Sequence, residues 1–338
     1  MKIVKKDISA FIKRKGEKYL YKLTTKIGKS VVTTGCHPVM VFRDGRIVSE
    51  VVENLKNGDF VATPRKLDFA EIDIKIPIPE IEAIYEGDHV ILHDNAKRSF
   101  AKKIKIPLYL NEEFSRLLGY LVGDGCILPK ANRCDLTNCD NEIIEDFIGI
   151  SRQMGIEPFV YSKKSITKTV ALNSITLVKL LTNIFKNRIK KEQKNMPDIV
   201  MFSRKHVLAN FLAALFDCDG TVRKDNPTFE YTTMSETLAD QVQLALLRFG
   251  IVSRKIKKMK AATNTKNKIK KEYFYITIEG KEKLEIFYKN IPLRCGHKRE
   301  RLGKIISKNV IPNTNNDLIP QEVNQIVKQC TKLLGIEY

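Results

Sequence analysis

The chain has 338 residues, which is enough for two or three domains, each with its own core. Its 59 basic and 39 acidic side chains leave a net charge of +20 and a pI near 9.5, so the expected partner is a polyanion, either nucleic acid or anionic lipid. The sequence contains no run of about 18 apolar residues that could span a bilayer and no basic amphipathic helix at either end. Its start lacks the apolar core of a signal peptide, and we therefore expect a cytoplasmic protein with no membrane partner.

Seven cysteines are scattered through the chain, at positions 36, 126, 134, 139, 218, 295 and 330. Their number is odd and no two are spaced as CxxC, so we expect neither a disulfide framework nor a zinc site. Reduced and mostly buried thiols are the expectation.

Residues 1–106 are predicted to form a β-rich domain. Short runs of alternating apolar and polar residues are separated by turn signals, among them Arg43-Asp44-Gly45 and Asn57-Gly58-Asp59. Prolines 77, 79 and 107 surround the end of this region.

An internal repeat follows over about 107–305. Asp124 and Asp219 are 95 residues apart and stand in similar apolar contexts. The same offset joins three further pairs of matching type: Gly119 with Ala214, the helix N-cap residues Asp140 and Ser235, and Gly155-Ile156 with Gly250-Ile251 at helix ends. An ungapped register over this span indicates two related halves.

Each half is predicted to have the order α-β-β-α-β-β-α in an α+β fold. In the first repeat, about 107–200, a helix after Asn111 carries the acid. It is expected to be followed by strands around 126–137, a helix over 140–154, strands around 157–161 and 167–173, and a helix over 174–187. In the second repeat, about 201–305, Ser203 is expected to cap the acidic helix, followed by strands over 221–223 and 228–233, a helix over 235–249, a hairpin over 251–279 and a helix over 281–289. Residues 306–338 are predicted to form a helical tail.

The two acids are expected to meet at the ends of two packed helices. Small residues recur four positions apart before each acid, which lets two helix backbones approach closely; these are Gly119 and Gly123 in the first helix, and Ala214 and Cys218 in the second. Each acid is followed by a glycine, Gly125 or Gly220, that can adopt a positive φ. Two carboxylates at negative helix ends repel one another and attract a cation. Oxygen ligands without nearby His or Cys indicate Mg²⁺, which can support phosphodiester hydrolysis.

The stretches LLGYLVGDG (117–125) and LAALFDCDG (212–220) resemble the two motifs of the LAGLIDADG homing endonucleases in their single-chain form. The resemblance covers about 107–305. It implies two pseudo-symmetric repeats that form a saddle over double-stranded DNA, in a monomer with an internal pseudo-two-fold axis. It also implies that Asp124 and Asp219 bind Mg²⁺, for which Mn²⁺ can substitute, together with the backbone of Gly123 and Cys218.

The same resemblance implies one lysine in each half near the cleavage centre. Lys194, in KNMP, corresponds to the lysine of the family's K-x-I-P block. For the second half, the family pattern around IPLRCGHKRERL favours Lys298, whereas the 95-residue offset nominates Lys289. Lys298 is preferred and Lys289 stays open.

Two basic segments are predicted to be ribbons that contact DNA. A two-stranded ribbon fits the major groove, and neutralisation of phosphates is expected to make the affinity fall steeply with salt. The candidate contacts are Lys163, Lys164 and Lys168 in the first repeat, and Arg254, Lys255, Lys257, Lys258, Lys268, Lys270 and Lys271 in the second.

The N-terminal region resembles the inner blocks of an intein splicing (Hint) domain. The matching features are Thr34 and His37 in TTGCHPVMV and the pair Gly58-Asp59. Splicing in that family also needs a Cys or Ser at the first junction and an Asn at the last one. The chain opens with Met1 and closes on Tyr338, so we expect protein splicing to be lost and His37 to be structural.

Alternative functions fit less of the sequence. LFDCDGTV also matches the haloacid dehalogenase phosphatase signature, in which Asp217 would be a nucleophile at the end of a strand. An EF-hand loop fails because Thr228 stands where the last ligand should be. A non-cleaving regulator or RNA maturase on the same fold stays open. The leading hypothesis is a Mg²⁺-dependent, site-specific endonuclease that cuts both strands of a long, asymmetric DNA site.

Overall fold

The structure is a computed structural model in which two compact units are distinguished, Asp68–Pro312 and Met1–Leu67 with Asn313–Tyr338. The units are described separately. The structure describes residues 8–13, 16, 18–68, 71–95, 102–164, 166–186, 193–224, 226–261, 269–308 and 321–335.

The N-terminal unit is built from short antiparallel strands, as predicted. β1 (Tyr21–Thr24) pairs with β2 (Ser30–Thr33), and a three-stranded sheet has the order β4-β3-β5. The bounds of these strands are Pro38–Arg43 for β3, Arg46–Val51 for β4 and Phe60–Val61 for β5, and a 3-10 helix spans Val52–Asn54. Both predicted turns are present, because Asp44 and Gly45 have φ values of 50° and 73° and Gly58 has a φ of 102°.

The strands β6 (Glu82–Glu86), β7 (His89–His93) and β8 (Ile104–Pro107) form a separate sheet that belongs to the larger unit. Val90 and Ile106 from this sheet are fully buried in the same core as the first acidic helix. The larger unit therefore begins at residue 68, whereas the sequence placed the domain boundary at 107. The reason is that apolar strand residues of 82–107 pack in the same core as the first repeat.

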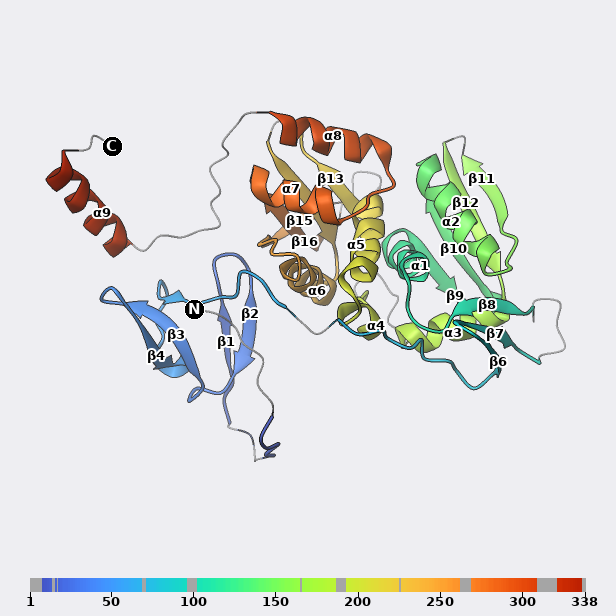
Figure 1. The fold of residues 1–338 in the computed structure, drawn as a ribbon, viewed down its shortest axis with the longest axis horizontal. Helices are drawn as coiled ribbons and strands as arrows, with labels where there is room; N and C mark the ends of the chain where they lie inside the picture. Colours follow the sequence, from blue (N-terminus) through green and yellow to red (C-terminus); the bar gives the residue numbers. More distant parts are fainter. Residues whose placement is uncertain are drawn as a thin grey trace. The chain divides into compact units, whose positions relative to one another are not determined.

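The first repeat has the predicted order α-β-β-α-β-β-α (Figure 1). Its elements are α1 (Glu112–Gly123), β9 (Gly125–Leu128), a 3-10 helix (Pro129–Ala131), β10 (Arg133–Asn138), α2 (Asn141–Gln153), β11 (Phe159–Lys164), β12 (Thr167–Asn173) and α3 (Ile175–Phe185). The strands form an antiparallel sheet of order β11-β12-β10-β9. Asn111 and Asp140 cap α1 and α2 as predicted, since their side chains accept hydrogen bonds from the N–H groups of Phe114 and Glu142.

The second repeat has the same connectivity and the equivalent sheet order, β13-β14-β16-β15. Its elements are α5 (Lys205–Asp219), β13 (Gly220–Val222), β14 (Thr228–Thr233), α6 (Glu236–Leu247), β15 (Arg254–Ala261), β16 (Lys270–Glu279) and α7 (Lys281–Asn290). Ser235 caps α6, and Gly250 closes it with a φ of 77°, matching Gly155 at 76° in the first repeat. The α+β fold with two related repeats is therefore confirmed.

Three helices are not part of the α-β-β-α-β-β-α order of the two repeats. α4 (Asp198–Met201) and α8 (Gly296–Ser307) were not predicted, whereas α9 (Gln321–Leu334) is the predicted helix of the tail. Ser203 does not cap α5, because its hydroxyl donates to the carbonyl of Val200 and so closes α4 instead. Within the described residues, no helix is long and apolar enough to cross a membrane.

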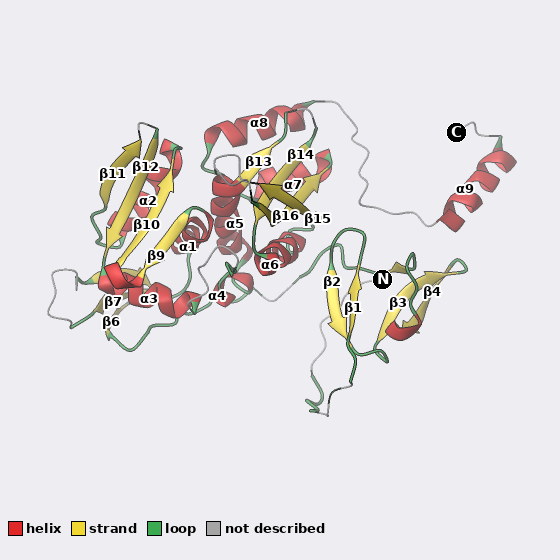
Figure 2. Cartoon of the chain, turned by 180° about the vertical axis from the view of Figure 1, so that it is seen from behind, coloured by secondary structure: helices red, strands yellow, loops and turns green. Residues whose placement is uncertain are grey.

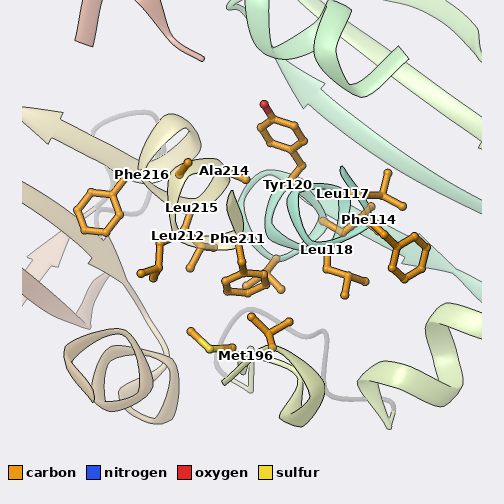
Figure 3. Packing of buried hydrophobic residues seen from close by; sticks show 14 of the residues in the cluster. Phe114, Leu117, Leu118, Tyr120, Met196, Phe211, Leu212, Ala214, Leu215 and Phe216 are labelled. Carbon is orange, nitrogen blue, oxygen red and sulfur yellow. The ribbon is translucent and has the colours of Figure 1, made fainter. Parts of the chain in front are cut away.

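The helices α1 and α5 lie side by side between the two four-stranded sheets (Figures 1 and 2). A Cβ atom added to Gly119 would lie only 2.6 Å from the carbonyl oxygen of Phe211 and 2.7 Å from the Cβ of Ala214. One turn further along, a Cβ added to Gly123 would lie 2.6 Å from the Cβ of Cys218. The predicted close approach of two backbones is therefore present, with buried side chains around it (Figure 3).

The glycine after each acid has a different role from the expected one. Gly220 has a φ of −84°, and Gly125 is not among the glycines with positive φ. A Cβ at Gly125 would instead lie 2.5 Å from the Cα of Leu121, and one at Gly220 would lie 2.3 Å from the carbonyl oxygen of Phe216. Both glycines are required because the chain turns back against the last turn of its own helix.

The Gly119→Ala variant is expected to lower the free energy of unfolding by about 1–3 kcal/mol, because its methyl group would overlap the α5 backbone. The matched control is Gly149→Ala, where the same methyl group in α2 meets nothing within 4 Å. That variant is expected to raise the free energy of unfolding by roughly 0.5–1 kcal/mol through helix propensity. Denaturant unfolding measures both, and equal effects would contradict the close helix contact.

Candidate functional site: two carboxylates at paired helix ends

The two predicted acids lie where the ends of α1 and α5 meet. Asp124 is the C-cap residue of α1 and Asp219 is the last residue of α5. Each directly follows one of the two residues that touch across the helix pair, Gly123 and Cys218. Burial raises the pKa of the Cys218 thiol, and the charges of both aspartates raise it further. Both carboxylates therefore act on the same thiol between the helices.

Asp124 is oriented by hydrogen bonds from both repeats. The side-chain amide of Asn138 donates to its Oδ2 at 2.7 Å, and the Cys218 thiol from α5 also donates to the carboxylate. Burial raises the pKa of Asp124 above its usual value, while Cys218, Lys194 and Asn138 oppose the rise. The ionised carboxylate is thus incompletely compensated by its protein neighbours.

One lysine lies at the end of each acidic helix. The ammonium group of Lys194 donates to the carbonyl of Gly123 in α1. The ammonium group of Lys298 donates to the carbonyls of Phe216, at 3.1 Å, and Asp217 in α5. Lys289 lies exposed on α7. The structure thus brings Lys194 and Lys298 to equivalent places, and both positive charges oppose the negative helix ends.

Asp217 is a buried residue of the site whose role the sequence did not reveal. Its carboxylate accepts hydrogen bonds from the N–H groups of Arg294, at 2.9 Å, and Cys295, at 3.1 Å. Burial raises its pKa to about 6, although these hydrogen bonds and Arg116 lower it. Asp217 lies within a helix that continues to Asp219 and not at the end of a strand, which contradicts the phosphatase alternative.

A pocket of about 400 Å³ opens beside Asp124 between the two repeats. The residues of its lining that matter here are Asp124, Asn138, Asp140, Cys295, His297 and Lys298. The expectation that no His or Cys lies near the acids is therefore wrong. Cys295 and His297 are distant from both motifs in sequence, and the contact appears only when the segment before α8 packs against repeat 1.

The basic hairpin β15–β16 divides its charges between two faces. Lys255 pairs with Asp240 and with Glu236 of α6, and its side chain is only 8% exposed. Lys257 lies on the same face by strand alternation and pairs with Glu272 at 2.7 Å. Lys255 was predicted to contact DNA, but its ammonium group is instead paired with carboxylates of α6.

By strand alternation the other face of β15 carries Ile256 and three basic residues, Arg254, Lys258 and Lys260. Lys258 also lies over the ring of Tyr275, 5.0 Å from its centroid. Lys260 was absent from the predicted contacts, although strict alternation in the hairpin could have identified it. Lys271 pairs in register with Lys260 and so belongs to this face, whereas Lys270 follows the opposite alternation.

The counterpart in the first repeat is only partly described. Lys168 is exposed and donates to the side chain of Asn141 at 2.9 Å. The side chains of Lys163 and Lys164, and the whole of Lys268 in the second hairpin, lie outside the described residues.

The second repeat matches a known protein family. Residues 206–292, which run from α5 past the end of α7, match the LAGLIDADG-like domain family. The second repeat is thus similar to LAGLIDADG-like domains. The first repeat, which lies outside this match, has the same element order and sheet order.

Several curated proteins are similar to nearly the whole chain. The replication factor C small subunit of Methanocaldococcus jannaschii is 28% identical over 317 residues, which are 93% of this chain and 15% of that protein. The ATP-dependent DNA helicase Hel308 of the same organism is 26% identical over 96% of this chain and 25% of its own length. The probable translation initiation factor IF-2 of the same organism is 28% identical over 88% of this chain and 28% of its own length. The chain thus spans less than a third of each of these relatives.

Solved structures with a similar arrangement include two kinds of protein. Full-length DUF199/WhiA from Thermatoga maritima aligns with a TM-score of 0.40 and 16% identity, over 65% of this chain and 67% of that chain. The homing endonuclease I-DmoI in complex with DNA and Ca aligns with a TM-score of 0.38 and 13% identity, over 53% of this chain and 88% of that chain.

The acidic end of the paired helices α1 and α5 fits a hard divalent cation. Asp124 and Asp219 offer carboxylate oxygens, the donors that Mg²⁺ prefers. The raised pKa of Asp124 indicates a carboxylate whose charge the protein alone does not balance, and a bound cation would balance it. The carbonyl of Gly123, predicted as a further ligand, accepts from Lys194.

The N-terminal residues Thr34 and His37 form a backbone turn rather than a polar side-chain pair. The N–H of His37 donates to the carbonyl of Thr34 at 3.3 Å, and its own carbonyl accepts from Val52 at 3.0 Å. The His37 side chain is exposed. The hydroxyl of Thr34 lies 3.5 Å from the Cys36 thiol.

The cysteines are less buried than predicted. Cys134 and Cys295 are buried and Cys218 is half-buried, whereas Cys36, Cys126, Cys139 and Cys330 are exposed. All seven are free thiols.

The buried carboxyl of Asp217 is expected to make stability depend on pH. Because its folded pKa of about 6 exceeds its usual 3.8, its stabilising contribution is present below pH 3.8 and is lost as the pH rises through 6. Relative to Asp217→Asn, the wild-type free energy of unfolding should fall by up to about 3 kcal/mol between pH 4 and pH 7. The control is Asp198→Asn, at an exposed carboxylate. The same pH dependence for both variants would contradict the assignment.

Proposed function

We propose that the two-repeat LAGLIDADG domain is a site-specific DNA endonuclease that cuts both strands of a long, asymmetric duplex with a divalent cation, Mg²⁺ or Mn²⁺. The observation that supports this most strongly is the pairing of one carboxylate and one lysine at each of two touching helix ends. Asp124 and Lys194 make up the first pair, and Asp219 and Lys298 the second. Two equivalent half-sites suit a reaction carried out once on each strand.

The residues of each half-site have complementary roles in this proposal. Asn138 and the Cys218 thiol fix the orientation of the Asp124 carboxylate. Lys194 and Lys298 lie at the helix ends, where their ammonium groups can shift from backbone carbonyls to the charge that develops on a phosphate or on a leaving oxygen. A divalent cation held by Asp124 and Asp219 would supply Lewis-acid stabilisation and a more acidic water.

The charge distribution supports a DNA partner. The chain carries a net charge of +20, and the face of β15 away from α6 presents Arg254, Lys258 and Lys260 along one ribbon. A ribbon with several charges on one face can follow a phosphate backbone, and a two-stranded ribbon fits the major groove. The carboxylates of α6 pair with Lys255 and so reduce the positive charge of the opposite face.

The relatives support the interpretation that this chain corresponds to a genetically mobile segment. Replication factor C, a helicase and a translation factor have unrelated names, yet each matches 88–96% of this chain over a minor part of its own length. Such a distribution is expected of a segment that moves between host genes, and a site-specific double-strand cut is the chemistry that would permit the move. We include the region 1–106 in this segment, because the matches extend over nearly the whole chain.

The decisive experiment is selection of cleaved sites from a random duplex library in Mg²⁺ or Mn²⁺. The recovered site should be cut on both strands by the wild type. Asp124→Asn and Asp219→Asn should each lower the cleavage rate at least about 100-fold, because each removes a charge from the cation site. Electrophoretic binding to the same duplex should be retained. Salt-sensitive binding without cleavage by the wild type would instead support a regulator or maturase on this fold.

The second active-site lysine can be tested with a matched pair. Lys298→Met should lower the cleavage rate by roughly 100-fold, because its charge lies at the end of α5. Lys289→Met removes the same charge from the exposed end of α7 and should leave cleavage of the selected site unchanged. Single-turnover kinetics at saturating enzyme separates cleavage from binding. A larger loss at Lys289 than at Lys298 would overturn the assignment.

A further inference from the structure

Three side chains from both repeats converge on one point beside the pocket. Asp140 is the N-cap residue of α2 in repeat 1, and Cys295 and His297 lie at the start of α8 in repeat 2. The sulfur of Cys295 lies 3.1 Å from Oδ2 of Asp140 and 3.1 Å from Nδ1 of His297. Nδ1 of His297 lies 3.4 Å from the same Oδ2. Each of the three side chains thus places one potential ligand atom close to the potential ligand atoms of the other two.

These separations suit a tetrahedral metal ion. Zinc binds sulfur at about 2.3 Å and nitrogen or oxygen at about 2.0–2.2 Å, which places neighbouring ligand atoms roughly 3.3–3.6 Å apart. The three observed separations of 3.1, 3.1 and 3.4 Å differ from these edges by a few tenths of an ångström. Small rotations of the side chains would admit an ion at the common centre.

The arrangement does not suit a nucleophilic triad. In a triad, one ring nitrogen of the histidine faces the nucleophile and the other faces the carboxylate. Here Nδ1 of His297 is the nearer nitrogen to the sulfur and also faces the carboxylate. Cys295 is fully buried, and burial raises the pKa of its thiol to about 12, which is the opposite of an activated thiolate.

The surrounding backbone holds the ligands in place. Oδ1 of Asp140 accepts from the N–H of Glu142 at 2.9 Å, which leaves Oδ2 directed at the sulfur. The N–H of Cys295 donates to Asp217 at 3.1 Å, and the N–H of Gly296 donates to Glu142. Partners of this kind orient the ligands of metal sites.

We propose that Asp140, Cys295 and His297 bind one Zn²⁺ ion that links the two repeats. Sulfur and imidazole donors favour Zn²⁺ over Mg²⁺, so this site is chemically distinct from the carboxylates of Asp124 and Asp219. Binding replaces the S–H bond of Cys295 by a sulfur–zinc bond and releases the proton to solvent. The ion would hold the first turn of α8, with Lys298, against repeat 1. The proposal does not depend on DNA cleavage.

The test uses the full chain, stripped of metal with a chelator, kept reduced and titrated with Co²⁺ as a spectroscopic probe. One equivalent should produce a sulfur-to-cobalt charge-transfer band that Zn²⁺ then removes. Loss of a residue that only hydrogen-bonds a metal ligand lowers metal affinity by roughly 10–100-fold. The variant His297→Gln removes a ligand itself, at an exposed position, and should weaken Co²⁺ binding by more than this. Cys295→Ser should abolish the band, whereas Cys330→Ser, in α9, and Asp124→Asn should retain it.

Thermal unfolding separates a lost ligand from a lost fold. Zn²⁺ should raise the unfolding midpoint of the wild type and leave that of His297→Gln unchanged, while the two metal-free proteins unfold at similar temperatures. A wild type without the charge-transfer band would overturn the proposal. So would a band that persists in Cys295→Ser, or unweakened Co²⁺ binding by His297→Gln.

Discussion

The contact between the backbones of α1 and α5 is the constraint on which the rest of the two-repeat domain depends. Gly119 faces Ala214, and Gly123 faces Cys218, at separations that no larger side chain would permit. Helices that approach so closely must end together, because their small residues are in register over a full turn. Asp124 and Asp219 are therefore brought to one place by the absence of side chains rather than by any attraction between them.

Buried polar groups hold the repeats at that contact. The hydroxyl of Ser115 in α1 donates to the carbonyl of Val207 at 2.9 Å, and Arg116 donates to the carbonyl of Pro292 at 3.1 Å. Arg116 also lies 3.8 Å from Asp217, whose carboxylate holds the segment before α8. Such polar groups are costly to bury, and the hydrogen-bond partners named here reach them only when both repeats are in place. They therefore favour this relative position of the two helices over other positions that would bury the same apolar area.

The same position creates the electrostatic character of the site. Two helix C-termini and two carboxylates concentrate negative potential, and Lys194 and Lys298 offset part of it through backbone carbonyls. Burial keeps the pKa of Asp124 above its usual value, although Lys194 and Lys298 lower it. A basic chain thus contains an acidic centre that favours a cation, surrounded by a surface that favours a polyanion.

Much of this protein could be derived from its sequence alone. The 95-residue offset, the apolar periodicity and the N-cap residues Asp140 and Ser235 determined both repeats and their order, because these signals are local and each repeat carries them independently. The paired acids were accessible for the same reason, whereas Lys194 was identified from its resemblance to the family's K-x-I-P block. The tertiary structure alone decided which lysine of the second half reaches α5 and which face of β15 carries its charges. It also placed Cys295 and His297 next to Asp140, 155 residues away along the chain. Such contacts depend on how one repeat packs against the other, and no local pattern of residues records that packing.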